Sequence, residues 1–276
     1  MRNQWLLCLV IPAMATGAFA KNEPKEDGVI IGKASPLRNL VPAEGLERQA
    51  AQQYSQLKQQ MAAKNALAPD TYHELVRLRA IAQRIIPHAT RFNPRAAKWQ
   101  WEVNLIGSNQ INAFCMPGGK IAFYTGILKQ LKLTDDEVAM VMGHEIAHAL
   151  REHAREQAGK NVLTKLGAVG LSIATGGKYD GLVNTGANLL SLQFSRSDES
   201  DADLVGLDIA ARAGYDPRAG ITLWQKMSAA NKSAPPQWLS THPSGPSRIK
   251  EIEKHLPEVM PLYQRADKPK PIVRAK

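Results

Sequence analysis

The sequence predicts an α+β fold that is mainly helical, with a small antiparallel sheet beside one central helix. Three observations predict it. Apolar residues recur at helical spacing through much of the 276-residue chain, three short β-type runs gather between residues 99 and 124, and the pentad His144-Glu145-Ile146-Ala147-His148 lies in an apolar helical stretch. Residues four apart lie on one face of a helix, so both imidazoles would converge on one cation while Glu145 flanks it. This is the spacing of a zinc hydrolase.

The first 20 residues have the features of a secretory signal peptide. An apolar run over residues 5–18 ends in Ala18-Phe19-Ala20, just before Lys21. The run is too short to span a bilayer, and the A-x-A ending suits signal peptidase, so we expect cleavage after Ala20 and an exported protein. Cys115 would then be the only cysteine left, which excludes an internal disulfide.

The charge balance says little about specific partners. The formal net charge is +10, but lysines and arginines are scattered along the chain. An exported protein rarely meets nucleic acid, so we expect no nucleic-acid partner. A solvated surface and peripheral contact with an anionic membrane both remain open, and the oligomeric state is not indicated.

The region before the sheet is predicted to be a linker followed by two helices. Residues 21–42 are polar and aperiodic, so we interpret them as the linker. Residues 43–64 carry apolar side chains at helical spacing, which predicts an amphipathic helix. A second helix follows Asp70, with Thr71 and Glu74 in capping-box spacing.

The predicted sheet consists of three runs, residues 99–106, 111–115 and 120–124. Gly107-Ser108-Asn109 and Pro117-Gly118-Gly119 separate them. Runs of this length with turn residues between them are typical of a small antiparallel sheet.

The helix that carries the pentad follows a short helix near residues 127–131. Thr134 and Glu137 have capping-box spacing at its start. Apolar residues cover much of its circumference, so we expect it to be central and buried.

The second half of the chain is predicted to be helical. Residues 161–192 would form a helical hairpin covering the pentad helix, with membrane contact as the alternative. A helix over residues 197–212 would stop at Gly214, a favourable residue just past a helix end. We therefore divide the chain into a signal peptide (1–20), a linker (21–42), one large domain (43–262) and a basic, proline-containing tail (263–276).

Two histidines do not complete a catalytic zinc site, which needs a third protein ligand and one open position. The pattern H-E-x-x-H-x-x-G-x-x-H would require Gly at 151 and His at 154, where this chain has Arg151 and Ala154. His153 lies nine residues from His144, about 900° around a helix of 3.6 residues per turn. We therefore expect His153 to face solvent.

Glu199 is the predicted third ligand. It opens a helix, and Asp203 follows one turn later, where a carboxylate can accept a hydrogen bond from the far nitrogen of a ligating histidine. Acidic residues also gather in first helical turns for dipole reasons, so the cluster alone is weak evidence. Asp198 and Asp201 are expected to be solvated.

One further segment, residues 240–244, places His242 before a proline and leads to Arg248. His242 could be a turn residue. It could also lean into the cleft and donate a hydrogen bond to a developing oxyanion, with Arg248 orienting it or adding charge. The residues alone leave both alternatives open.

These motifs together resemble a family of zinc metalloendopeptidases. The family includes the HtpX-type membrane proteases, the CAAX prenyl endopeptidases and soluble bacterial periplasmic members. The resemblance extends from about Asp70 to Leu256. Four motifs carry it, in family order: Asn112-Ala113-Phe114 with Pro117-Gly118-Gly119, His144-Glu145-x-x-His148, Glu199-x-x-x-Asp203, and Ser240-Thr241-His242-Pro243-Ser244 through Arg248.

The resemblance implies a gluzincin fold over residues 43–262 and one zinc ion per chain. Because residues 161–192 are too short and interrupted to span a membrane, it places the chain in the soluble periplasmic branch. It also implies a latent form in which His242 blocks the metal. The implied roles are zinc ligands for His144, His148 and Glu199, general base for Glu145, outer support for Asp203, and a catalytic or gating part for His242 and Arg248.

The implied activity is hydrolysis of peptide bonds by a zinc-bound water, with Glu145 taking the proton. Polypeptide would lie along the edge strand at Asn112, Ala113 and Phe114, held through its main chain. Such recognition is broad, so unfolded or misassembled cell-envelope proteins are the expected substrates, in protein quality control. The alternatives are a chaperone-like or latent zinc-binding module, which the intact Glu145 argues against, and a zinc amidase acting on cell-wall peptides.

Overall fold

The computed structural model describes residues 27–174, 188–231, 237–242 and 246–270. The predicted signal peptide and the end of the basic tail lie outside these residues. The elements are α1 (Ala43–Ala63), α2 (His73–Ile85), β1 (Glu102–Ile106), β2 (Ala113–Met116), β3 (Lys120–Tyr124), α3 (Thr125–Gln130), α4 (Asp135–Leu150), α5 (His153–Ala174), α6 (Arg196–Arg212), α7 (Ala219–Asn231), α8 (Gln237–Thr241) and α9 (Pro246–Arg265), with short 3₁₀ helices η1 (Pro36–Leu40), η2 (Ile86–Arg91), η3 (Pro94–Lys98) and η4 (Leu189–Ser191).

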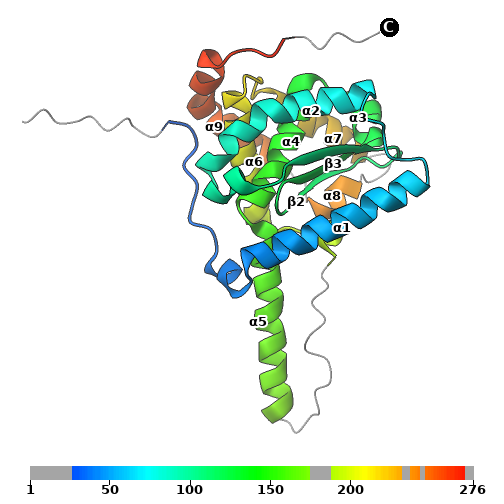
Figure 1. Ribbon diagram of the computed structural model, residues 1–276. Coiled ribbons are helices and arrows are strands. Elements are labelled where there is room, and N and C mark those ends of the chain that lie inside the picture. The colour runs from blue at the N-terminus through cyan, green and yellow to red at the C-terminus, as the bar shows by residue number, and fades with distance from the viewer. Residues whose placement is uncertain (1–26, 175–187, 232–236, 243–245, 271–276) are drawn as a thin grey trace, which may run out of the picture.

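Helix α4 lies at the centre of this mainly helical fold. It packs against α2, α6 and α7, and against strand β2 of the sheet. Helix α1 crosses the other face of the sheet (Figure 1). Strand β3 shows the division: Ile121 and Phe123 join the main core with α4, while Ala122 packs in a second cluster with Tyr54 of α1. Successive side chains of a strand point to opposite faces of the sheet, so both faces of this sheet are buried.

The sheet is mixed, and its expected antiparallel arrangement is wrong at β1. The strand order is β1-β3-β2, with β1 parallel to β3 and β2 antiparallel to it. The tight turn at Pro117-Gly118-Gly119 pairs β2 with β3, and Gly118 and Gly119 have φ of 81° and 79°. The longer link over residues 107–112 carries the chain past the position of β3. Strand β2 consequently lies at the edge of the sheet.

The start of α4 confirms the predicted capping box. Thr134 accepts from the backbone of Glu137, whose side chain accepts from the backbone of Thr134. Every residue of α4 from Glu137 to Leu150 is buried. The capping box predicted for α2 is not formed, because the helix starts after Tyr72 and Glu74 instead pairs with Arg77 at 3.0 Å.

Helices α4 and α6 cross at Gly143 and Gly206, where they approach each other more closely than residues with side chains would allow. A Cβ placed on Gly206 would lie 2.7 Å from the backbone nitrogen of His144, and one on Gly143 would lie 2.7 Å from the carbonyl oxygen of Gly206. Each glycine thus admits the backbone of the other helix. The contact sets the first turns of α6 beside the pentad. As predicted, α6 is followed by Gly214, which has φ of 88°.

The described part of the predicted linker, residues 27–42, packs on the domain. Val29 is buried, and its backbone N–H donates to Asp208 of α6 at 3.1 Å. Further along, η1 lies against the start of α5. The segment is therefore in contact with helices α5 and α6.

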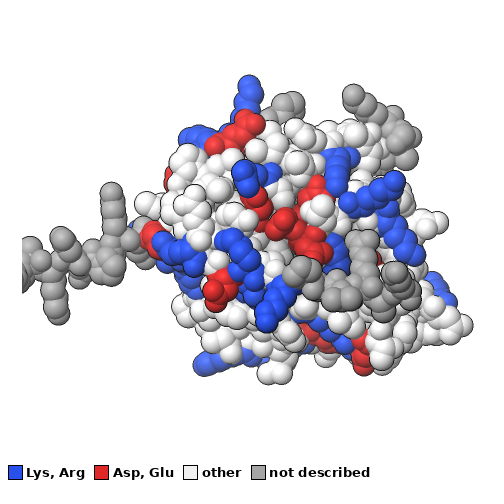
Figure 2. Space-filling view, turned by 90° about the horizontal axis from the view of Figure 1, so that it is seen from above, with Lys and Arg blue, Asp and Glu red and all other residues white. Residues whose placement is uncertain are grey.

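Helix α5 extends away from the body instead of covering α4, unlike the predicted hairpin (Figure 1). Residues 175–187 lie outside the described part of the chain. Within the described residues, no helix combines the length and apolar character that crossing a membrane requires. Peripheral membrane contact stays a prediction. On the face shown in Figure 2, basic side chains are scattered among acidic ones.

Candidate metal centre

Four buried side chains converge between α4, α6 and α8. His144 and His148 come from α4, Glu199 comes from α6, and His242 directly follows α8; their ligand atoms all lie within 4.8 Å of one another. The structure therefore brings together the three predicted ligands and adds His242 to them.

The donor atoms have the separations of a tetrahedral metal site. The Nε2 atom of His144 lies 3.1 Å from Nε2 of His148 and 3.3 Å from Nδ1 of His242. The carboxylate of Glu199 lies 3.0 Å from His242 and 3.5 Å from each of the other two histidines. Bonds of 2.0–2.1 Å at tetrahedral angles give edges of roughly 3.3 Å. The donor set and its spacing fit zinc.

Asp203 and Arg248 support this cluster from behind. Nδ1 of His144 donates to Asp203 at 3.1 Å, which is the predicted outer contact. Arg248 forms a fork with Asp203, two bonds of 2.6 Å, and donates to Glu199 at 2.6 Å. Its guanidinium also lies 3.6 Å from the ring centre of Trp224. Arg248 thus holds two carboxylates in place.

Charge around the site decides which groups are ionised. Burial by itself would raise the pKa of Asp203, but Arg248 and His144 outweigh it and lower the pKa to about 2. For Glu199, burial is likewise outweighed, chiefly by the hydrogen bond from His242, so its pKa is lowered. Burial and the neighbouring His144 hold the pKa of His148 well below its usual value. A carboxylate and a neutral imidazole are the forms that bind zinc.

His153 is buried, so its expected solvent-facing position is wrong. It is 3% exposed, and its Nδ1 lies 2.9 Å from Nδ1 of His148. The rotation argument fails because α4 ends at Leu150 and a new helix begins at His153, with Glu152 at φ of 59° between them. Asp198 was also expected to be solvated, but it is buried as the capping residue of α6.

Glu145 points into the cavity beside the cluster and is held by Trp238. The indole Nε1 of Trp238 donates to Oε1 of Glu145 at 2.5 Å, and Nε2 of His242 lies 3.6 Å from the same oxygen. Trp238 is fully buried, stacked on Trp224. Helix α8 therefore presents both Trp238 and His242 to the pentad.

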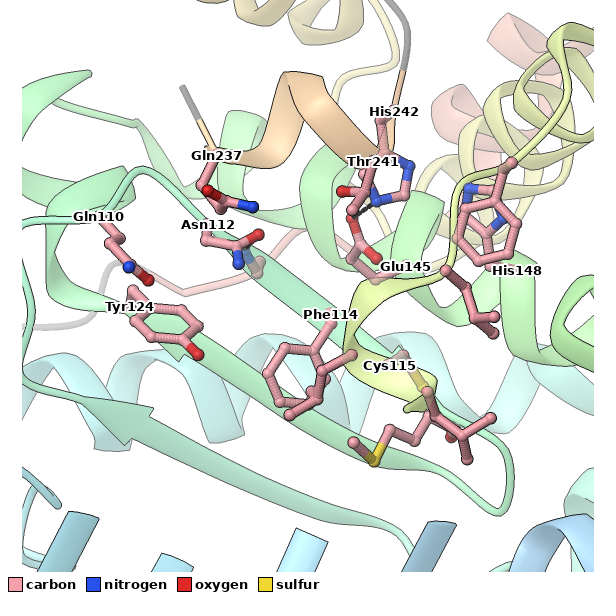
Figure 3. A pocket seen from close by; sticks show the side chains of 16 residues that line it. Gln110, Asn112, Phe114, Cys115, Tyr124, Glu145, His148, Gln237, Thr241 and His242 are labelled. Carbon is pink, nitrogen blue, oxygen red and sulfur yellow. Dashed lines mark hydrogen bonds and ion pairs between the residues drawn. The ribbon is translucent and has the colours of Figure 1, made fainter. Parts of the chain in front are cut away.

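A cavity of about 300 Å³ opens between β2 and the segment around η4. Glu145, His148 and His242 lie at one end of it, and Gln110 and Tyr124 lie at the other (Figure 3). The three residues predicted to bind substrate, Asn112, Ala113 and Phe114, all line it.

The outer edge of β2, with which no other strand pairs among the described residues, borders this cavity. Asn112 accepts from Tyr124 of β3, so in an alternating ladder the N–H and C=O groups of Ala113 and Cys115 point away from β3. The Asn112 side chain accepts from the N–H of Ala113 at 3.0 Å.

Comparison with known proteins gives the family. The model of peptidase family M48 matches residues 74–256. The chain belongs to peptidase family M48. M48 peptidases are zinc-dependent, and the cluster of His144, His148, Glu199 and His242 offers donor atoms that could bind such a metal.

Several M48 relatives are similar over part of their length. The mitochondrial metalloendopeptidase OMA1 of Arabidopsis thaliana is 42% identical over 59% of this chain and 34% of its own. The OMA1 metalloendopeptidase of Bos taurus is 32% identical over 75% of this chain and 42% of its own. The beta-barrel assembly-enhancing protease of Escherichia coli O157:H7 is 27% identical over 67% and 39%. The chain thus spans well under half the length of these relatives.

Trp238 and His153 were not predicted from the sequence as parts of this M48 site. Trp238 precedes His242 by one helical turn, so the spacing that identified the pentad could have indicated it. His153 had no such signal, because the backbone break at Glu152 is invisible to a helical rotation.

Proposed function

We propose that this chain is a zinc-dependent endopeptidase that hydrolyses peptide bonds in polypeptides. The observation that carries the proposal is a buried tetrahedral donor cluster with Glu145 beside it, at one end of a cavity bordered by a free strand edge. In this proposal His144, His148 and Glu199 hold the zinc ion. Membership of family M48 supports it.

Zinc bound there would lower the pKa of a water molecule to about 7 and polarise the peptide carbonyl. Glu145 takes the proton of the attacking water and returns it to the leaving amine. The indole N–H of Trp238 fixes one carboxylate oxygen, leaving the other for this proton transfer. Asp203 and Arg248 keep the ligands in place through their contacts with His144 and Glu199.

Substrate would add a strand to the free edge of β2. The outward N–H and C=O groups of Ala113 and Cys115 would pair with the peptide main chain once the Asn112 side chain releases the N–H of Ala113. Side-chain pockets contribute less in this mode, so cleavage would be broad. Extended, unfolded chains fit such an edge best.

We assign the activity to the soluble periplasmic branch of the family, acting on unfolded or misassembled cell-envelope proteins. The predicted signal peptide supports export. The Escherichia coli relative that is named a beta-barrel assembly-enhancing protease supports an envelope role.

His242 acts as a gate. Its Nδ1 completes the tetrahedron at the position that a catalytic site leaves open for water. This conformation is a closed form, and α8 must shift for hydrolysis.

The test is cleavage of unfolded casein, with zinc content measured in parallel. Wild type and His242→Ala should cleave. Chelated protein and Glu145→Gln should not, although Glu145→Gln keeps its zinc because Glu145 is not one of the ligands. Glu253→Gln, at an exposed position of α9, is the matched control.

Three outcomes would count against the proposal. Cleavage by Glu145→Gln would show that Glu145 is not the base. Zinc-loaded wild type and His242→Ala that bind casein without cutting it would favour a chaperone-like module. Release of peptides from purified cell wall, with casein intact, would favour the amidase.

A further inference from the structure

The two zinc-binding histidines of α4 are supported by different partners. His144 is backed by the carboxylate of Asp203, whereas His148 is backed by another imidazole, that of His153. The two imidazole planes of His148 and His153 meet at 74°, with their centres 4.9 Å apart. This edge-on contact is buried, so water does not compete for it.

We propose that His153 is a positioning residue of the zinc centre, which fixes the tautomer and the orientation of His148. The proposal rests on the proposed function only in taking His148 as a ligand.

The tautomers follow from the distances. Nε2 of His148 faces Nε2 of His144 at 3.1 Å and Glu199 at 3.5 Å, so Nε2 offers its lone pair to the metal. A neutral imidazole then carries its hydrogen on Nδ1. Nδ1 of His153 lies 2.9 Å from Nδ1 of His148, so it must accept that hydrogen. His153 therefore carries its own hydrogen on Nε2.

The far side of His153 faces a fixed carboxylate. Its Nε2 lies 3.9 Å from Oδ1 of Asp198, which favours a hydrogen on that nitrogen. Asp198 is itself held by two capping bonds with Ser195. The order Asp198, His153, His148 thus links the start of α6 to a metal ligand.

The backbone break between α4 and α5 makes this contact available. Glu152 adopts φ of 59°, and its carboxylate pairs with Arg38 at 2.9 Å and Arg155 at 2.8 Å. The two ion pairs stabilise a conformation that is unfavourable for a residue with a side chain. They hold His153 under His148 instead of on the opposite side of a continuous helix.

Phe194 restrains the other side of the same ligand. Its ring stacks on His148 with centres 4.0 Å apart and an interplanar angle of 27°. With the ring plane set by Phe194, the hydrogen bond to His153 decides which nitrogen faces the metal.

The test is zinc affinity, measured by competition with a chromophoric chelator at fixed pH without substrate. Loss of an outer partner typically weakens metal binding 10- to 100-fold. We expect His153→Leu to raise the zinc Kd by roughly that factor. His153→Gln should recover part of it, since its carbonyl oxygen accepts a hydrogen bond. His73→Leu, at a side chain 57% exposed, is the control.

A second measurement does not depend on the variants folding. Nitrogen NMR of the imidazoles in zinc-loaded wild type should place hydrogen on Nδ1 of His148 and on Nε2 of His153.

The results that overturn the proposal are distinct from those that overturn the peptidase. Wild-type zinc affinity in folded His153→Leu, equal weakness of the Gln and Leu variants, or hydrogen on Nδ1 of His153 would each refute the positioning role. A wild type that binds no zinc would refute the proposed function itself.

Discussion

Replacing Gly206 by alanine tests whether the close crossing of α4 and α6 builds the metal centre. A Cβ at this position would lie 2.7 Å from the backbone nitrogen of His144 and 2.8 Å from the carbonyl carbon of Gly143. Ordinary carbon contacts begin near 3.5 Å, so the helices must separate by about 0.8 Å. That shift moves Glu199 away from the two histidines of α4.

The expected effect is larger on the site than on stability. Overpacking costs about 1–3 kcal/mol, and alanine offsets about 1 kcal/mol of that through its higher helix propensity. The net loss of unfolding free energy is then on the order of 0–2 kcal/mol. A displacement near 1 Å costs roughly 100-fold at a catalytic centre, and we expect a similar loss of casein cleavage.

The assays are urea unfolding, zinc competition and casein cleavage on the same preparations. Gly45→Ala is the matched control, because its new Cβ would lie 3.9 Å from the nearest atom, Cβ of Pro42. It should leave zinc affinity and cleavage unchanged and stabilise α1 by a few tenths of a kcal/mol or more. If Gly206→Ala keeps wild-type zinc affinity and cleavage, the helix crossing does not set the site geometry.

Three further predictions concern the gate, the buried charges and alkaline pH. His242→Ala should raise casein cleavage above wild type because it frees the fourth position; lower cleavage at full zinc content would instead indicate a transition-state role. Arg248→Met should lower the unfolding free energy of zinc-free protein by about 3–5 kcal/mol, since Glu199 and Asp203 lose their partner, and an unchanged urea midpoint would contradict this. Burial raises the pKa of Tyr215 from 10.0 to about 12, so its neutral form stabilises the fold fully below pH 10, and that stabilisation is lost as the pH rises to 12. Tyr215→Phe should therefore flatten the alkaline fall in the urea midpoint, and an equally steep fall would refute the assignment.

Local sequence patterns predicted most of the helices and the three ligands. The pentad needs only the helical repeat to bring His144 and His148 together, and the spacing of Glu199 and Asp203 uses the same repeat on α6. The capping boxes of α4 and α6 belong to the same kind of local signal, although only the first was predicted.

Errors arose where a single backbone conformation or a long-range pairing decided the outcome. The φ of 59° at Glu152 brings His153 back under the site, against the rotation of a continuous helix. Strand order was equally undetermined, because alternation shows which face of β1 is buried and not which strand lies beside it.

The sequence by itself predicted the helical framework, the pairing of His144 with His148 and the proposed role of Glu145 as base, because each depends on residues within a turn or two of one another. Only the tertiary structure decided that His242 closes the tetrahedron, that Arg248 binds the carboxylates of Glu199 and Asp203, and that Gly206 allows α6 to reach the pentad. Those contacts join residues tens of positions apart. The packing of whole helices and strands fixes these contacts, and no local periodicity in the sequence predicts that packing.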